Sequence, residues 1–158
     1  KGILSAICAL LAAAAVLAGT ASRVAYPEGY RNWKHVKSMV IGAGHPLHTS
    51  FGGIHHIYAN PAAMAGYRTG RFADGAVIVF DLLQPVKGDR AVTEGDRKAV
   101  IVMQKDRKLY AATGGWGFEI FAGSSRTDRQ VGNKAAEMCF ACHTARSAQD
   151  YVFSEYRN

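Results

Sequence analysis

The sequence predicts an α+β fold built mainly on an antiparallel β-sheet with a few short helices. Three apolar stretches are short enough to be strands, and glycine-containing turns separate them; they cover residues 76–83, 98–105 and 116–121. Asn60-Pro61 is a good start for a helix, because asparagine caps a first turn and proline suits the first helical position. The length of 158 residues fits one domain with a small addition.

The N-terminal segment is apolar and differs sharply from the rest of the chain. Residues 3–18 carry no charged side chain, and a basic residue stands on each side of them. This layout is typical of a secretory signal and also of a membrane-spanning helix, since about 17–20 apolar residues can cross a bilayer. We expect residues 1–22 to form an N-terminal single transmembrane helix, residues 23–27 a linker, and residues 28–158 the folded domain.

An uncleaved signal peptide is the alternative for the same N-terminal residues. The expected location is the bacterial inner membrane, crossed once, with the folded domain on the periplasmic side. The net charge is +7, but the basic residues are scattered, and the runs at 96–98 and 105–108 mix both signs. A nucleic-acid surface needs basic residues clustered on one face, so nucleic acid is not an expected partner. A basic surface instead favours acidic redox partner proteins or anionic lipid, and a generally solvated surface explains the charge equally well.

The elements of the domain are predicted in order along the chain. An amphipathic helix is expected over residues 28–37, because Tyr30, Trp33 and Val36 recur at helical spacing. The other expected elements, besides the three apolar strands, are strands over 38–41, 54–59 and 109–113, a loop over 42–50, and helices over 61–68 and 134–142.

Near the C-terminus the chain reads Cys139-Phe140-Ala141-Cys142-His143. Two thiols at this spacing with a histidine directly after them form the attachment signature of c-type haem. Each cysteine sulfur can add to one vinyl group of the haem, and His143 then stands where it can bind the iron. The predicted C-terminal helix is therefore a haem-attachment helix that holds one covalent haem c.

Two other interpretations of the same five residues stay open. A CxxC pair can supply half of a zinc site, or it can be a redox-active dithiol. A zinc site needs a second pair of ligands at short spacing, and the only other cysteine in the sequence is Cys8. A thioredoxin-like dithiol stands early in a βαβ unit rather than near the end of a chain. Both alternatives are therefore less favoured than haem attachment.

Seven stretches of the chain, this motif among them, resemble the cytochrome P-460 family and its relatives, the β-type cytochromes c′. They occur in the family's order and with similar gaps, at residues 26–33, 57–61, 69–75, 105–108, 114–118, 139–143 and 152–153. The resemblance implies a mainly antiparallel β fold, a homodimer and one c-type haem. It also implies that His143 is the proximal iron ligand and that the distal face of the iron is open.

The chain departs from the hydroxylamine-oxidising members of that family at three positions. Their lysine that is cross-linked to the haem corresponds to Phe80, and their distal arginine corresponds to His55. Their distal carboxylate falls near Val100 and Ile101, which are apolar here. The resemblance therefore favours the β-type cytochromes c′, which bind nitric oxide and carbon monoxide beneath packed phenylalanines, over hydroxylamine oxidation.

A distal pocket is predicted from Phe80, Phe51, His55 and Ile101. The two phenylalanines would exclude water and crowd the site, although ordinary core packing explains them equally well from sequence alone. His55 can donate a hydrogen bond to a bound ligand or bind the iron directly, and an internally bonded histidine is the plain alternative. Methionines at several positions are explained by core filling, so none of them is expected to be a sixth iron ligand.

These observations predict a c-type cytochrome with a five-coordinate haem that binds a diatomic gas, above all nitric oxide, or transfers single electrons. One alternative is an accessory subunit of a larger membrane redox complex, docked through the N-terminal helix. The other is an enzyme that oxidises hydroxylamine or reduces peroxide, for which His55 is the only distal acid–base candidate. Arg126 and Arg129 are candidate partners for the haem propionates.

Overall fold

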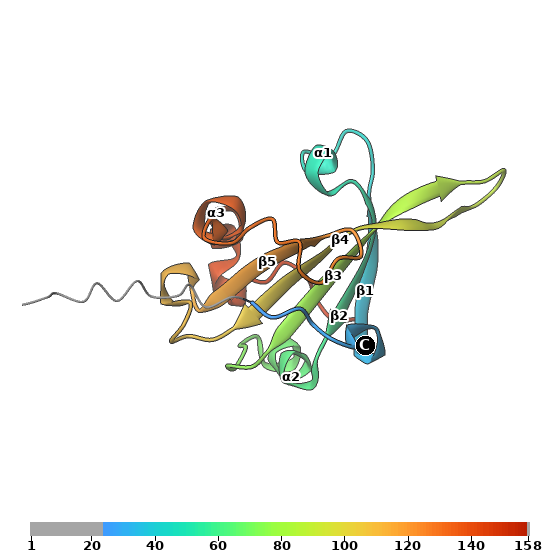
Figure 1. Ribbon diagram of the computed structural model, residues 1–158. Coiled ribbons are helices and arrows are strands. Elements are labelled where there is room, and N and C mark those ends of the chain that lie inside the picture. The colour runs from blue at the N-terminus through green and yellow to red at the C-terminus, as the bar shows by residue number, and fades with distance from the viewer. Residues whose placement is uncertain (1–23, 158) are drawn as a thin grey trace, which may run out of the picture.

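A computed structural model describes residues 24–157 of the chain. Five antiparallel strands form one sheet, and each strand pairs with the next one in the sequence (Figure 1). The strands are β1 (Lys34–Ile41), β2 (Gly53–Ala59), β3 (Val77–Lys87), β4 (Val92–Lys105) and β5 (Trp116–Ala122). This order needs no crossover connection, because each antiparallel strand begins at the end of the sheet where the previous strand stops.

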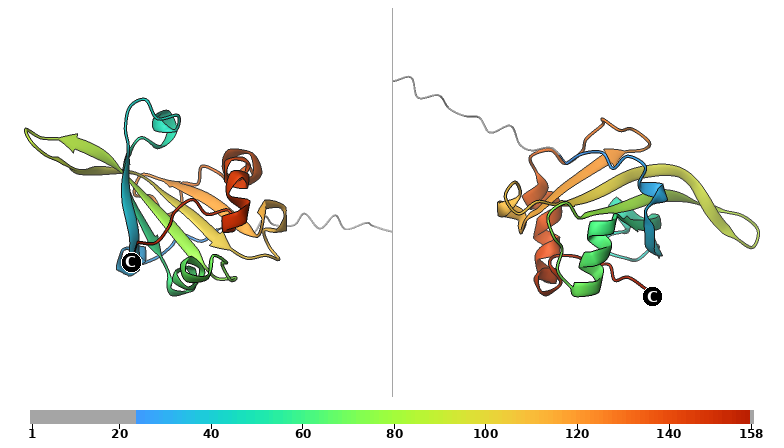
Figure 2. Two further views of the ribbon diagram at one scale, coloured as in Figure 1. Left: turned by 180° about the vertical axis from the view of Figure 1, so that it is seen from behind. Right: turned by 90° about the horizontal axis from the view of Figure 1, so that it is seen from below.

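One face of the sheet carries an apolar cluster that includes Ile57, Ile78 and Phe118. Helix α2 (Pro61–Thr69) and the residues around Val152 pack against this cluster. Viewed from below, α2 and the C-terminal helical segment project from the same side of the sheet (Figure 2). This helix-covered face is the one on which the candidate site lies.

The opposite face of the sheet is covered by the first described residues of the chain. Val79 and Val100 are fully buried there, together with Tyr30 from the N-terminal segment. Asp81 is also fully buried on this face, and it accepts hydrogen bonds from the Tyr30 hydroxyl and from Arg97 Nε, each at 2.7 Å. A buried carboxylate needs such partners, because an unpaired charge in the interior is strongly destabilising.

The sequence expectation is confirmed most closely at α2. The Asn60 side chain accepts a hydrogen bond from Ala63 N at 2.8 Å, and Pro61 occupies the first turn. Gly70 ends the helix in the left-handed conformation.

The other helical elements are short; they are η1 (Tyr30–Asn32), α1 (His48–Phe51), η2 (Ala111–Thr113), the π-helix η3 (Ala136–Phe140), α3 (Ala141–His143) and η4 (Thr144–Gln149).

The helix predicted over residues 28–37 is wrong. Only the single 3-10 turn η1 forms there, and β1 begins at Lys34. Tyr30 and Val36 belong to the cores on opposite faces of the sheet. Their spacing therefore reflects a segment that passes from one face to the other, not one face of a helix.

Two further strand predictions are corrected. Residues 109–113 form a turn and η2 rather than a strand. The β3–β4 hairpin is much longer than the apolar stretches that predicted it, because β3 continues to Lys87 and β4 already begins at Val92. The added residues are mostly exposed and pair through the backbone, so hydrophobic patterning did not reveal them. They form the arm that projects from the sheet in Figure 1.

The predicted transmembrane helix is not supported. Within residues 24–157 no helix is long and apolar enough to cross a membrane. The segment 1–22, on which that prediction fell, lies outside the described residues. The fold class is accordingly a mainly antiparallel sheet with a few short helices, and the predicted inner-membrane location, which depended on the anchor, is not supported either.

Tyr67 on α2 gives a prediction about pH. Its hydroxyl shares a hydrogen bond of 2.7 Å with Ser154 in the C-terminal segment, and burial raises the pKa of Tyr67 to about 12. Because the unfolded value is 10.0, this contribution to stability is complete below pH 10 and is lost as the pH rises toward 12. The free energies of unfolding of the parent and of Tyr67→Phe, measured with urea, should therefore converge as the pH rises over this range. Parallel pH profiles for the two proteins would contradict it.

Candidate functional site

Strand register brings the predicted distal residues to the helix-covered face. Phe80 on β3 pairs with Ile57 on one side and with Ile101 on the other. Ile101 in turn pairs with Ile120 on β5. Alternate residues of a strand share a face, so Leu82, Ala99 and Ala122 lie on the same side as this row. The result is an apolar floor across three strands.

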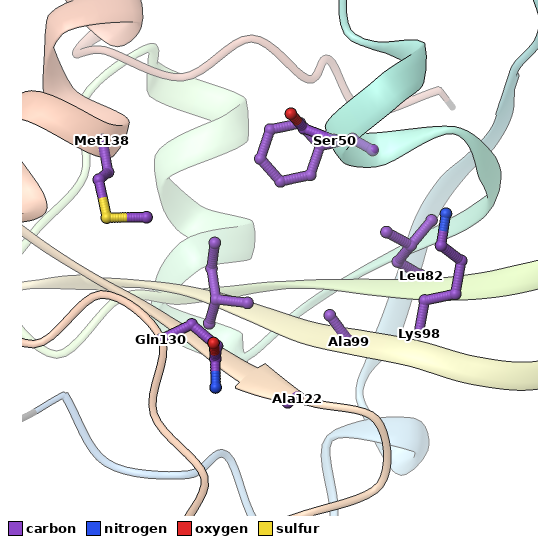
Figure 3. Close-up of a pocket in the computed structure, with 9 residues that line it drawn as sticks. Ser50, Leu82, Lys98, Ala99, Ala122, Gln130 and Met138 are labelled. Carbon is purple, nitrogen blue, oxygen red and sulfur yellow. The ribbon is translucent and has the colours of Figure 1, made fainter.

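A cavity of about 460 Å³ opens on this floor, between α1 and the C-terminal helical segment (Figure 3). Its walls come from the α1 turn, from β3 to β5, from the loop after β5 and from the π-helix η3. The lining residues are Ser50, Phe51, Leu82, Lys98, Ala99, Ile120, Ala122, Gln130 and Met138. Most of this lining is apolar, and Lys98 and Gln130 contribute polar groups.

The motif begins next to this cavity, because Cys139 directly follows the lining residue Met138 in the chain. Cys139 is partly buried at the end of η3, whereas Cys142 is exposed in α3, and both are free thiols. Burial raises the pKa of the Cys139 thiol to about 11. A reactive redox dithiol needs a lowered pKa instead, so the redox interpretation of the CxxC pair is disfavoured.

His143 is held in an orientation suited to binding a metal ion. Its Nδ1–H donates to the backbone carbonyl of Tyr151 at 2.7 Å, which leaves the lone pair on Nε2. The imidazole packs between Phe118 and Phe153, with ring centroids 5.0 and 5.1 Å away. Burial lowers the pKa of His143, so the ring is neutral at pH 7. A backbone acceptor on one ring nitrogen is the usual way of fixing a ligating histidine.

The carbonyl that fixes His143 is itself held by a set of buried contacts around Asp150. Asp150 Oδ1 accepts from Lys105 Nζ at 2.7 Å, and Oδ2 accepts from Phe72 N at 2.9 Å. The Trp116 indole N–H donates to the Asp150 carbonyl at 2.8 Å. Asp150 and Tyr151 both have positive φ, of 52° and 66°, which non-glycine residues adopt only when their surroundings hold them. We call these contacts the Asp150 latch.

His55 is completely buried against Phe80, with ring centroids 4.1 Å apart. Its Nε2–H donates to the Phe51 carbonyl at 2.6 Å, while Nδ1 is buried without a partner in the structure. Burial lowers the pKa of His55, so the ring is neutral at pH 7. The histidine therefore ties the α1 turn to the sheet and retains one unused acceptor nitrogen beneath the site.

The structure separates the predicted distal residues into two groups. Phe51 lines the cavity directly. Phe80, His55 and Ile101 share the same sheet face but are not among the lining residues. The sequence reasoning missed Lys98, although its position at the start of an apolar strand could have drawn attention to it.

Arg126 and Arg129, the candidate propionate partners, lie elsewhere. Arg126 pairs with Glu28 at 2.8 Å, and Arg129 Nη1 donates to the Val24 carbonyl at 2.7 Å. Val24 belongs to the cluster on the opposite face of the sheet. The cation at the cavity is Lys98, whose Nζ donates to the Gly52 carbonyl at 2.5 Å.

The surroundings of the motif fit a haem and not a zinc ion. Among residues 24–157 no group of three or more histidine, cysteine, aspartate or glutamate side chains converges on one point. The motif adjoins Met138, a lining residue of the apolar cavity, and His143 offers a neutral imidazole with a free Nε2. His55, whose Nδ1 is buried without a partner, lies on the same face of the sheet. A flat apolar cofactor with one metal atom matches these groups. The fold and the site therefore define a haem protein on an antiparallel sheet.

The comparison with known families agrees with this class. The family model described as Cytochrome P460 matches residues 27–154. The chain belongs to the cytochrome P460 family, as the sequence resemblance predicted, and membership indicates a c-type haem protein. A search of curated proteins finds no significant match.

Proposed function

We propose that one haem is attached covalently to Cys139 and Cys142, and that His143 Nε2 is the proximal ligand of its iron. The orientation of His143 carries this proposal. Its Nδ1–H is committed to the Tyr151 carbonyl, so the lone pair on Nε2 is available at neutral pH, directly after the two thiols in the chain. The cavity walls would cover much of the apolar ring system. Lys98 is the one cation among the lining residues, and its ammonium would pair with a propionate.

We further propose that the chain binds a diatomic gas, with nitric oxide as the leading candidate, or transfers single electrons. The bound haem would supply an iron with an open coordination position, which suits both roles. The lining supports a small uncharged ligand, because it is mostly apolar and the Lys98 ammonium is already engaged with the Gly52 carbonyl. The net charge of +7 supports acidic redox partner proteins. A homodimer is expected from the family resemblance.

An enzyme that oxidises hydroxylamine or reduces peroxide is less well supported. Such chemistry needs a group that moves protons on the distal side. The one candidate, His55, is committed to the Phe51 carbonyl through Nε2 and lies beneath the cavity floor. Phe80 stands where the cross-linking lysine of the oxidising relatives is expected, and phenylalanine cannot form that bond.

The test is an absorption spectrum of the purified holoprotein, oxidised and reduced, with and without carbon monoxide and nitric oxide. We expect a high-spin, five-coordinate haem whose reduced form responds to both gases. A low-spin spectrum that neither gas changes would refute gas binding and leave electron transfer. Rapid turnover of hydroxylamine with an electron acceptor would overturn both roles in favour of the enzyme.

A further inference from the structure

A row of polar side chains crosses the sheet on the face away from the cavity. His35 Nε2 lies 2.9 Å from Ser38 Oγ, and the same oxygen lies 2.6 Å from His56 Nδ1. The other ring nitrogen of His56, Nε2, lies 2.5 Å from Glu94 Oε1. The four residues come from β1, β2 and β4, and we call them the outer histidine cluster.

A β-bulge brings two of these residues together. His35 and Ser38 are three positions apart on β1, so in a regular strand their side chains would point to opposite faces. The pairing of β1 with β2 shifts register between His35 and Lys37, which places Ser38 opposite His56 and His35 opposite Tyr58. Bulges commonly re-aim a side chain in this way. The irregularity places two imidazoles and one hydroxyl around a single point.

Glu94 fixes the hydrogen on His56. A carboxylate only accepts hydrogen bonds, so Nε2 of the neutral ring carries the hydrogen and Nδ1 presents its lone pair toward Ser38 and His35. This carboxylate–histidine arrangement is the one that orients and strengthens histidine ligands of metal ions. His35 is exposed, so its hydrogen can move to Nδ1 by exchange with water and free Nε2.

The geometry points to a binding site for a divalent first-row transition metal, with His35 Nε2 and His56 Nδ1 as its ligands. The ion would replace the Ser38 hydroxyl as the bridge between the two rings, and water and that hydroxyl would complete the coordination. Imidazole pairs suit Zn²⁺, Cu²⁺ and Ni²⁺ rather than Mg²⁺ or Ca²⁺. His35 and Ser38 are both exposed, so rotation of the His35 side chain can bring its Nε2 to metal-bond length from an ion held by His56.

The site has an open coordination sphere. In the described part of the chain no third histidine, cysteine, aspartate or glutamate converges with these two nitrogens. Glu94 instead contributes its negative charge from behind His56, with its side chain 46% exposed. The site lies on the face opposite the cavity, so metal binding there is independent of the haem.

The experiment is calorimetric titration of the full-length holoprotein, free of any affinity tag, with Zn²⁺. We expect one Zn²⁺ per chain. His35→Ala and His56→Ala should each weaken binding by more than ~10-fold, and Glu94→Gln, which keeps the hydrogen bond and removes the charge, by about 10-fold. His45→Ala is the matched control, because His45 is an exposed histidine in the loop before α1 and outside the cluster. It should bind Zn²⁺ as the parent does.

A second readout identifies the ligands themselves. The EPR spectrum of the Cu²⁺-loaded protein should show coupling to two imidazole nitrogens, and to fewer in either histidine variant. An unchanged haem absorption spectrum in each variant shows that the fold is intact. Failure of the parent to bind Zn²⁺, or equal binding by the parent and the His35→Ala/His56→Ala double variant, would overturn the proposal.

Discussion

Replacing Asp150 with alanine should lower the free energy of unfolding by about 3–5 kcal/mol. The side chains of Lys105 and Asp150 are only 3% and 11% exposed, so the variant leaves the Lys105 ammonium buried without its anion. The backbone N–H of Phe72 also loses its acceptor. Alanine is in addition less tolerant than aspartate of the positive φ at this position. Chemical unfolding of the holoprotein measures the loss.

Two variants separate the causes of this loss. Asp150→Asn keeps an acceptor for Phe72 N and tolerates the positive φ, so the loss that remains reports the missing charge. Glu28 and Arg126 form an exposed ion pair, with side chains 61% and 67% exposed. Glu28→Gln breaks this pair and should change the free energy of unfolding by less than ~1 kcal/mol. An effect of Asp150→Ala as small as that of Glu28→Gln would show that the latch contributes little.

Asp150→Ala should also change the surroundings of the haem, because the Asp150 latch adjoins the carbonyl that orients His143. Asp150 and Tyr151 are neighbours, and the Tyr151 carbonyl is the acceptor that orients His143. If the latch positions this carbonyl, Asp150→Ala should broaden or shift the haem absorption spectrum even below the unfolding transition. A spectrum identical to that of the parent would restrict the latch to a role in stability.

Replacing both Cys139 and Cys142 with serine should abolish covalent attachment of the haem. Serine keeps the size of the side chain but lacks the sulfur that forms the thioether, and each single variant should retain one bond. A haem stain after denaturing electrophoresis, together with intact mass, measures attachment. Met138→Leu is the control, because it changes the residue next to the motif and leaves both sulfurs in place.

The outcome of that experiment is decisive for the proposed function. A parent protein with two unmodified thiols, produced in a host with haem-ligation machinery, would refute covalent attachment. Retention of haem by the double variant under denaturing conditions would show that another residue forms the bond. Loss of covalent haem with an unchanged fold would leave the cavity and His143 available for testing with added haem.

Local signals in the sequence predicted several features well. The α2 helix begins at Pro61 because the Asn60 side chain caps it, and both residues are adjacent in the chain. The apolar stretches over residues 76–83 and 98–105 predicted two strands, which the structure contains within β3 and β4. Such features depend on residues within a few positions of each other, so they can be recognised without the fold.

Other features depended on pairing between distant segments. The exposed arm of the β3–β4 hairpin is held by backbone hydrogen bonds that no hydrophobic pattern marks. The segment around Tyr30 and Trp33 looked helical, but packing on two sides of the sheet decided its course. The ion pair between Asp81 and Arg97 was not predicted either, because a buried pair can be recognised only when the positions of both side chains are known.

The sequence by itself determined the spacing of Cys139, Cys142 and His143, which is the local spacing that two thioethers and one iron ligand require. Only the tertiary structure decided how His143 is oriented and what surrounds the motif. The Asp150 latch joins Lys105, which is 45 positions away in the chain, and the outer histidine cluster depends on a bulge and three strands. Contacts of this kind form only when the sheet brings distant side chains within bonding distance, and strand register, not residue order, sets that distance.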